Sequence, residues 1–356
     1  MVKCLVWDLD NTLWNGTLLE DGSVEIPEPI RELVRTLDAR GILQTVASKN
    51  DHDHAWARLE ELGLAEYFVL PRIGWNPKSE SIRSVADELK FALDTIAFVD
   101  DQEAELAEVT FHLPQVRTYR AEQVLELAGL PEFSPATVTV DSRRRRQMYQ
   151  ASFRRQEAQA GFTGPDEDFL RSLELKMTIS PATDSELTRV EELTRRTSQM
   201  NATGVHYSHE ALSALIDDPG HRVLVVSMQD RFGPHGAVGV LLLETGSEVW
   251  HLKLLATSCR VVSFGAGSII LRWLINQAAT ADAHLVADFR PTDRNRMMEI
   301  AYRFTGFADE ACACQAVLAD PGLDGLQRLH LEPVPQEEPT TVALVAPDLT
   351  EAIGVH

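Results

Sequence analysis

The chain has 356 residues, of which 44% are hydrophobic and 24% are charged, and this composition indicates a globular protein long enough for two domains. Its formal net charge is -21, with 54 acidic side chains against 33 Lys and Arg, which argues against general nucleic-acid binding because phosphate backbones are held by clustered cations. No apolar run approaches membrane-spanning length and the first residues lack a signal-peptide pattern, so we expect no membrane contact and a cytoplasmic location.

The first hundred residues alternate short apolar runs with helical patterns, which predicts a parallel sheet flanked by helices. We expect strands at 3–8, 42–47, 68–70 and 95–99, and helices at 27–41, 51–62 and 79–90. In open parallel sheets a ligand lies beyond the carboxyl ends of the strands. Asp8, Ser48 and Asp100 each follow or end such a strand, so we expect them to meet at one site.

A charged stretch rich in Arg and Gln follows and predicts a helical connector, after which apolar strands alternate with helices. There we expect helices at 184–199, at 208–217 and from Ser268, and strands at 223–228, 237–244, 250–256 and 284–289. The predicted domains are 1–125 and 175–331, joined by a helical linker at 126–174 and followed by a Pro- and Glu-rich flexible tail at 332–356. The basic run 143–146 is either a solvated helix face or a docking patch for an acidic partner.

Two carboxylates, Asp8 and Asp10, stand two residues apart where the chain leaves the first predicted strand. Holding them together is costly unless a cation binds, and Mg²⁺ prefers carboxylate oxygens combined with waters and phosphate oxygens. An Asp carboxylate is also a competent nucleophile for phosphoryl transfer through an aspartyl-phosphate. The alternative is a capped strand end with solvated acids.

Three further elements follow in order along the chain. Ser48 can donate a hydrogen bond to a phosphoryl oxygen, Lys78 can screen the charge shared by nucleophile and phosphate, and the pair Asp100 and Asp101 can supply metal ligands. With Asp8 and Asp10, this ordered set resembles the four motifs of the haloacid dehalogenase superfamily, and the match covers about the first third of the chain.

The resemblance implies a Rossmann-like parallel sheet with a minimal cap, because little sequence separates Asp8 from Ser48. It implies that Asp8 is the nucleophile, that Asp10 is the general acid and base, and that Mg²⁺ is the cofactor. The implied metal ligands are Asp8, the backbone carbonyl of Asp10 and Asp100, with Asp101 close by. The implied substrate-binding residues of this domain are Thr12, Lys49 and Asn50.

In the second domain, Cys259 follows an apolar strand and precedes a turn with Gly265 and an apolar helix. This arrangement suits a pantetheine pyrophosphate or another anion. The helix N-terminus and Arg260 can shift the thiol toward thiolate, which makes Cys259 a candidate acyl carrier, although a cysteine after a strand is more often a small core residue. His235 and His251 are candidate bases, with a structural role as the alternative for each.

The remaining cysteines predict free thiols in a reducing compartment. Cys312 and Cys314 are separated by one residue, but the sequence shows no matching second pair of ligands beside them, so we expect no zinc site.

Over 1–307 the chain resembles the FkbH family of glyceryl transferases. The resemblance is carried by the motifs WDLDNTLWNGTLLEDG (7–22), SKN (48–50), WNPKS (75–79), FVDD (98–101), DRFG (230–233), SCRV (258–261) and PTDRN (291–295). It implies an α+β second domain of N-acetyltransferase type and 1,3-bisphosphoglycerate as the small phosphorylated three-carbon donor. It further implies that Cys259 carries the glyceryl group to the phosphopantetheine thiol of an acyl carrier protein for polyketide extender units, with Arg260, Asn201 and Asn295 binding substrate.

Two other functions remain open. The first is an Mg²⁺-dependent phosphatase whose second domain only recognises a partner. The second is an acetyltransferase that uses coenzyme A, with a regulatory first domain.

Overall fold

The computed structural model describes residues 1–197, 200–318 and 324–350, and the chain divides into two compact units, Met1–Phe153 and Arg154–His356. The boundary falls inside helix α7 (Arg145–Ala160), within the stretch that the sequence predicts as a helical linker. The Rossmann-like parallel sheet expected for the first domain and the α+β arrangement expected for the second are confirmed.

The first unit is built on five parallel strands in the order β3-β2-β1-β4-β5. Their bounds are β1 (Cys4–Trp7), β2 (Leu43–Ser48), β3 (Arg72–Ile73), β4 (Ile96–Asp100) and β5 (Arg117–Arg120). Strand β1 is central and wholly buried, and Cys4 pairs with Leu43 on one side and with Ile96 on the other. The carboxyl ends of β2, β1 and β4 therefore lie at the same edge of the sheet.

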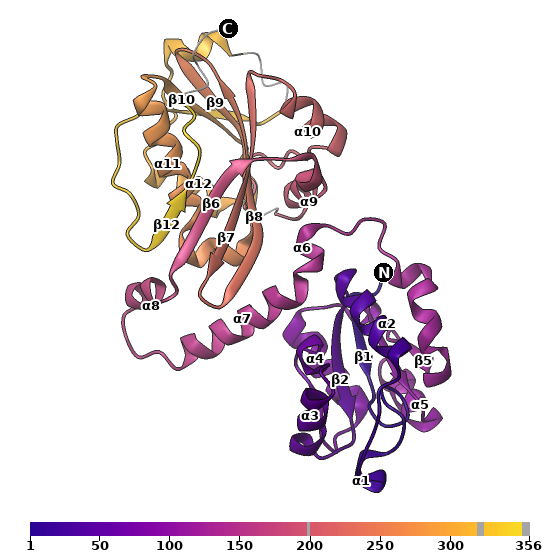
Figure 1. The fold of residues 1–356 in the computed structure, drawn as a ribbon. Coiled ribbons are helices and arrows are strands. Elements are labelled where there is room, and N and C mark those ends of the chain that lie inside the picture. Colours follow the sequence, from indigo (N-terminus) through magenta and orange to yellow (C-terminus); the bar gives the residue numbers. More distant parts are fainter. Residues whose placement is uncertain (198–199, 319–323, 351–356) are drawn as a thin grey trace. The chain divides into compact units, whose positions relative to one another are not determined.

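Helices cover both faces of this sheet (Figure 1). On one face pack α2 (Glu28–Ala39), α3 (His52–Glu61) and the 3-10 helix η3 (Ala121–Gly129), and on the other α4 (Lys78–Leu89) and α5 (Glu103–His112). Shorter helices are α1 (Leu18–Asp21), η1 (Ala65–Tyr67), η2 (Leu93–Thr95), η4 (Pro131–Phe133) and α6 (Val140–Arg143). Residues 8–27, all of them described, contain only the helix α1, in agreement with a minimal cap.

One local prediction for this unit is wrong. The strand expected at 68–70 lies at Arg72–Ile73 instead, because Leu70 has φ +49°, which ends extended backbone. Of the basic run 143–146, Arg143 and Arg144 are exposed, as a solvated face requires, whereas Arg146 binds Asp38 at 2.9 Å and lies over the ring of Tyr67 and is therefore not free for docking. Strand β5 was not predicted.

The second unit is built on a mixed sheet in the order β11-β10-β9-β8-β7-β6-β12. The bounds are β6 (Leu175–Pro181), β7 (His221–Asp230), β8 (Gly233–Thr245), β9 (Val249–Thr257), β10 (His284–Phe289), β11 (Gln327–Leu331) and β12 (Val342–Val345). Neighbours from β6 to β9 are antiparallel, whereas β9 and β10 are parallel and are joined through α11 (Ala266–Thr280).

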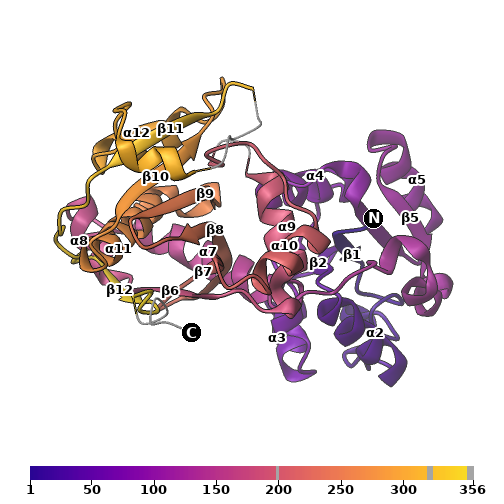
Figure 2. The same cartoon turned by 90° about the horizontal axis from the view of Figure 1, so that it is seen from above.

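The two faces of this sheet carry different helices, as Figure 2 shows for α9 and α11. On one face pack α9 (Leu187–Arg196) and α10 (His209–Ile216), and on the other α8 (Asp166–Ser172), α11 and α12 (Arg296–Phe304). The short helices are η5 (Asp184–Glu186), η6 (Cys259–Phe264) and η7 (Ala313–Val317). Among the described residues, no helix has both the length and the apolar character needed to cross a bilayer.

The flexible tail predicted at 332–356 differs from the structure over its middle part. Strand β12 pairs in parallel with β6, and Val342 and Leu349 bury their side chains in the core. The segment is ordered despite the Pro and Glu residues around it, because burial of two aliphatic side chains stabilises the folded state by about 3–6 kcal/mol. Residues 351–356 lie outside the described residues.

Candidate functional site

The first candidate site lies where β1, β4 and α4 meet. Asp8 directly follows β1, Asp100 ends β4, and Lys78 is the first residue of α4. The Lys78 ammonium donates to Asp8 Oδ1 at 2.5 Å and to Asp100 Oδ2 at 2.8 Å. All three side chains are at most 6% exposed. The expected convergence of Asp8 and Asp100 is therefore confirmed, and Lys78 joins them.

The charges of this trio do not balance. Burial raises the pKa of Asp8 to about 7, although the Lys78 ammonium lowers it, and the neighbouring Asp100 raises it again. Burial alone would lower the pKa of Lys78, but the two carboxylates raise it above its ordinary value, so Lys78 is held as a cation. Two carboxylates thus share one ammonium, which favours the arrival of a further cation.

The acidic cluster fits a hard divalent cation. Carboxylate oxygens of Asp8, Asp100 and Asp101 all lie within 4.8 Å of one another. Asp101 Oδ1 is buried and has no hydrogen-bond partner among the described residues, so an acceptor there stands free. Burial raises the pKa of Asp101, and Asp100 raises it further. Carboxylate oxygens are the ligands that Mg²⁺ takes in proteins, and these three residues would hold it.

Asp10 lies in a different environment from Asp8. Its Oδ1 accepts hydrogen bonds from the Trp14 indole at 2.8 Å and from the Leu18 backbone amide at 3.0 Å, and its Oδ2 accepts one from the Asn50 amide at 3.1 Å. Both oxygens are therefore held in place, and the Asp10 side chain is not part of the acidic cluster. That the Asp10 backbone carbonyl is a metal ligand stays a prediction.

The other site residues expected in this domain fall into two groups, those that can still bind a ligand and those already bound to another residue of the protein. Ser48 ends β2, and its hydroxyl lowers the pKa of Asp8 through a hydrogen bond. Thr12 has a buried hydroxyl without a partner in the described part of the chain, which leaves it free for a ligand. Lys49, by contrast, pairs with Glu105 at 2.5 Å, and Asn50 is used to orient Asp10. Lys49 and Asn50, both expected to bind substrate, therefore each have a partner within the protein.

The second candidate site surrounds Cys259, the first residue of η6 after β9. Its thiol is exposed, in contrast to that of Cys4, whose pKa is raised to about 12 by burial. The Ser258 hydroxyl accepts from the backbone amide and the guanidinium of Arg260, at 3.4 and 3.2 Å. The small-core alternative for Cys259 is therefore wrong, and Arg260 is oriented toward the start of the same helix.

The two histidines considered as bases each bind a carboxylate. His251 Nε2 lies 2.8 Å from Asp288 Oδ1. His235 Nε2 lies 3.1 Å from Asp230, which also accepts from Arg155 at 2.5 Å and from two backbone amides of the β7–β8 turn. Burial would raise the pKa of Asp230, but the hydrogen bonds of His235 and Arg155 lower it below its ordinary range. Both histidines thus have structural partners, and neither nitrogen in these contacts is directed at Cys259.

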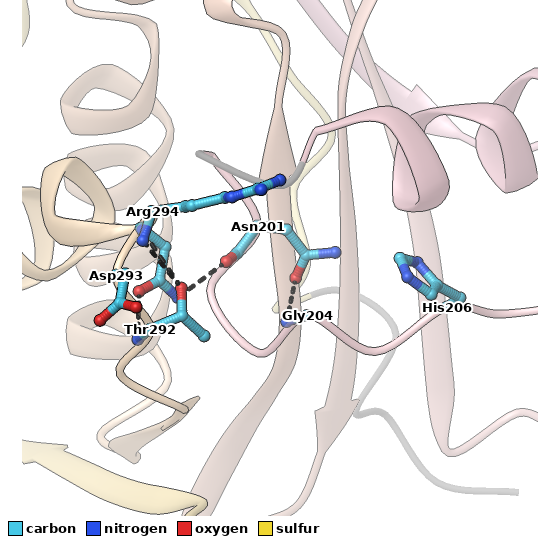
Figure 3. A pocket seen from close by; sticks show the side chains of 7 residues that line it. Asn201, Gly204, His206, Thr292, Asp293 and Arg294 are labelled. Carbon is cyan, nitrogen blue, oxygen red and sulfur yellow. Dashed lines mark hydrogen bonds between the residues drawn. The ribbon is translucent and has the colours of Figure 1, made fainter.

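A pocket of about 280 Å³ opens in the second unit (Figure 3). Its lining residues are Asn201, Gly204, His206, Thr292, Asp293, Arg294 and Asn295, and Cys259 is not among them. The structure therefore brings Asn201 and Asn295 together, as a shared substrate role requires, but does not place Cys259 in the same wall.

The two asparagines of this pocket are bound to backbone. Asn201 Oδ1 accepts from the amides of Thr203 and Gly204, and the Asn295 side-chain amide donates to the carbonyls of Asn201, Ala202 and Arg290. They hold the two loops that form the pocket. The motif PTDRN contains Thr292 and Arg294 and could have indicated these further lining residues, whereas His206 has no comparable signal.

No family model and no curated protein matches the chain. Among solved structures, the N-terminal part of protein BF1531 from Bacteroides fragilis, which contains a phosphatase domain complexed with Mg, is similar at 28% identity over 38% of this chain and 42% of that one, with a TM-score of 0.36. The similarity therefore spans less than half of that protein's length.

Acetyltransferase structures are also similar to part of the chain. GCN5 from Tetrahymena is 13% identical over 46% of this chain and 99% of that one, with a TM-score of 0.34. The putative acetyltransferase yncA from Salmonella typhimurium, solved with acetyl-CoA, is 18% identical over 46% and 97%, with a TM-score of 0.32. The fold of each unit is described by the strand order of its sheet and does not depend on these structural similarities.

Proposed function

We propose that the chain is an Mg²⁺-dependent bifunctional enzyme that loads a glyceryl group from 1,3-bisphosphoglycerate onto an acyl carrier protein. The first unit removes phosphate at Asp8, and the second carries the acyl group on Cys259. The observation that carries the proposal is the buried trio of Asp8, Lys78 and Asp100, with Asp101 beside it, whose Oδ1 has no hydrogen-bond partner among the described residues. Its motivation in the second unit is the exposed thiol of Cys259, which begins the short helix η6 just after β9.

The phosphoryl step uses the two oxygens of Asp8 differently. Lys78 binds Oδ1, so Oδ2 is the oxygen that attacks the phosphorus of the phosphate ester. An O–P bond forms to Asp8 while the ester O–P bond breaks, and the leaving alkoxide takes a proton from Asp10. Water then attacks the aspartyl-phosphate, gives its proton to Asp10 and releases inorganic phosphate. Mg²⁺, when bound, supplies neutralisation of the charge between nucleophile and phosphate.

Asp10 suits the proton transfers because its position is fixed. Trp14, the Leu18 amide and Asn50 hold both of its oxygens, so its orientation survives the change of protonation. The Lys78 ammonium and the Ser48 hydroxyl donate hydrogen bonds to the other carboxylate, that of Asp8. They stabilise the negative charge that develops on the transferred phosphoryl group. Lys78 begins α4 and Ser48 ends β2.

The acyl step uses the acyl phosphate of the donor, which is an activated acyl group. The Cys259 thiolate attacks the carbonyl carbon of the acyl phosphate, a C–S bond forms, the C–O bond breaks and phosphate leaves. The thiol of the phosphopantetheine arm then attacks the thioester, and Cys259 is regenerated. The exposure of Cys259 supports a macromolecular acceptor, because a carrier-bound arm can reach it without a lid.

The test is the intact mass of the carrier protein after incubation with the enzyme, Mg²⁺ and enzymatically generated 1,3-bisphosphoglycerate. A glyceryl adduct is expected with the wild type. Cys259→Ala is expected to abolish the adduct but to retain phosphate release, and Asp8→Asn to abolish the loss of the ester phosphate. A carrier protein that gains no mass under turnover would contradict the proposal.

The same experiment distinguishes the two alternatives. If the second unit only recognises a partner, Cys259→Ala retains every activity. If the chain is an acetyltransferase, acetyl-coenzyme A replaces 1,3-bisphosphoglycerate as donor and the acceptor gains an acetyl group. No observation on the second unit favours either alternative over the glyceryl transfer.

A further inference from the structure

A second cluster of metal-ligating side chains lies in the second unit, away from the residues assigned above. It consists of His284, Cys312, Cys314 and His330. We propose that these four side chains bind one zinc ion as a structural site. The sequence showed no second ligand pair beside Cys312 and Cys314, and the expectation of no zinc site was based on that; the fold supplies the pair from two strands.

The sheet register brings the histidines together. His284 is the first residue of β10, and β11 runs antiparallel beside it with His330 opposite Val286. His284 and His330 are therefore diagonal neighbours on one face of the pair. Their nitrogens, Nδ1 of His284 and Nε2 of His330, are 2.9 Å apart, and the rings lie 5.1 Å apart.

The cysteines come from the segment between α12 and β11. Cys312 immediately precedes η7 and Cys314 lies in its first turn. The Cys312 sulfur lies 3.5 Å from Nδ1 of His284, and one ligand atom from each of the four residues lies within 4.8 Å of the others. Two strands and one helical turn thus converge on a single point.

The separations are close to those of a tetrahedral zinc site. Zn–S bonds of about 2.3 Å and Zn–N bonds of about 2.0–2.1 Å place the ligand atoms about 3.3–3.8 Å apart. The contact between Cys312 and His284 is already in this range, and the two histidine nitrogens, 2.9 Å apart, must separate by about 0.4 Å. Because no pair is more than 4.8 Å apart, no other separation must contract by more than about 1.5 Å. Such a movement is small for side chains of which three are only partly buried.

The ligand types select the metal. Two thiols and two imidazoles suit zinc, whereas Mg²⁺ takes oxygen ligands, so this site does not compete with the carboxylates of Asp8 and Asp101 for the same ion. Four protein ligands close a tetrahedral site and leave no position for substrate, which is the arrangement of structural zinc. The zinc would clamp the edge strand β11 and the segment around Cys312 to β10.

The test is the metal content of the full-length protein, expressed with zinc in the medium and measured by mass spectrometry of the metals after gel filtration. We expect about one zinc ion per chain in the wild type and a loss to background in Cys314→Ser and in His284→Gln. Cys259→Ala is the matched control, because it removes an exposed thiol of the same unit outside the cluster and should keep the zinc. Equal zinc in all four proteins, or none in the wild type, would overturn the proposal.

Cobalt substitution of the wild type keeps the test independent of whether the variants fold. Co²⁺ in a site of two thiolates and two imidazoles gives strong visible d–d bands of tetrahedral cobalt and thiolate-to-cobalt charge transfer. Their absence, or a Cys312–Cys314 disulfide in freshly prepared protein, would refute the site. Because none of these readouts involves phosphate release or carrier loading, failure here leaves the proposed function standing, and the reverse also holds.

Discussion

Replacing Lys78 by Met removes the one cation between two buried carboxylates while keeping a side chain of similar length. The Asp8 and Asp100 side chains are 6% and 1% exposed and lie 2.5 and 2.8 Å from the Lys78 ammonium. Removing one partner of a buried ion pair leaves an uncompensated charge and costs about 3–5 kcal/mol. In Mg²⁺-free solution we therefore expect the first unit of Lys78→Met to lose at least about 3 kcal/mol of its free energy of unfolding.

Hydrogen exchange of the β1 and β4 amides measures this loss, because amides in a central strand exchange through global opening of the unit. A loss of about 3 kcal/mol accelerates that exchange roughly 100-fold. Lys49→Met is the matched control, since Lys49 pairs with Glu105 at the same 2.5 Å but its side chain is 40% exposed. Such a surface pair is worth about 0–1 kcal/mol. Equal acceleration in both variants would refute the reasoning that burial decides the cost.

Three further predictions concern the metal ligands and the second unit. Asp101→Asn should weaken Mg²⁺ binding roughly 10-fold or more in titration calorimetry, and unchanged affinity would remove Asp101 from the site. Without Mg²⁺, Asp8 keeps its proton in the folded state up to a pH of about 7, whereas in the unfolded state it loses the proton near pH 3.8. The melting temperature should therefore fall as pH rises from 3.8 to about 7. The variant Asp8→Asn should show a smaller fall. Asp230→Asn should destabilise the second unit by about 3 kcal/mol in urea unfolding, because it leaves the guanidinium of Arg155 without its carboxylate, whereas the exposed Asp218→Asn should change little.

The first site could be predicted from the sequence because its residues stand at the ends of strands. Asp8, Ser48 and Asp100 each lie at the carboxyl end of a strand in a parallel sheet. Parallel strands bring these ends to one edge of the sheet, independently of the conformations of the connecting loops. The position of Lys78 followed from its place in the motif order. The hydrogen bond from Asn50 to Asp10 was not predictable, because it depends on the path of two turns that no periodic pattern describes.

The second unit shows where sequence reasoning fails. His284 and His330 meet Cys312 only because β10 and β11 pair in one antiparallel register, and the sequence between the two strands contains no pattern that fixes this register. Strand β12 was missed for a related reason, since four residues among Pro and Glu give too short an apolar signal to predict a strand. Asn295 was indicated by the motif PTDRN and Asn201 by the family resemblance, but that their side chains bind backbone is visible only in the folded loops.

Phosphate release from a phosphate monoester such as 3-phosphoglycerate, with and without Mg²⁺, tests the chemistry at Asp8 most directly. We expect the wild type to release phosphate only with Mg²⁺, and Asp8→Asn to be slower by at least about 100-fold while it keeps the same fold. Release that is equally fast in Asp8→Asn, or that proceeds unchanged without the metal, would contradict the account.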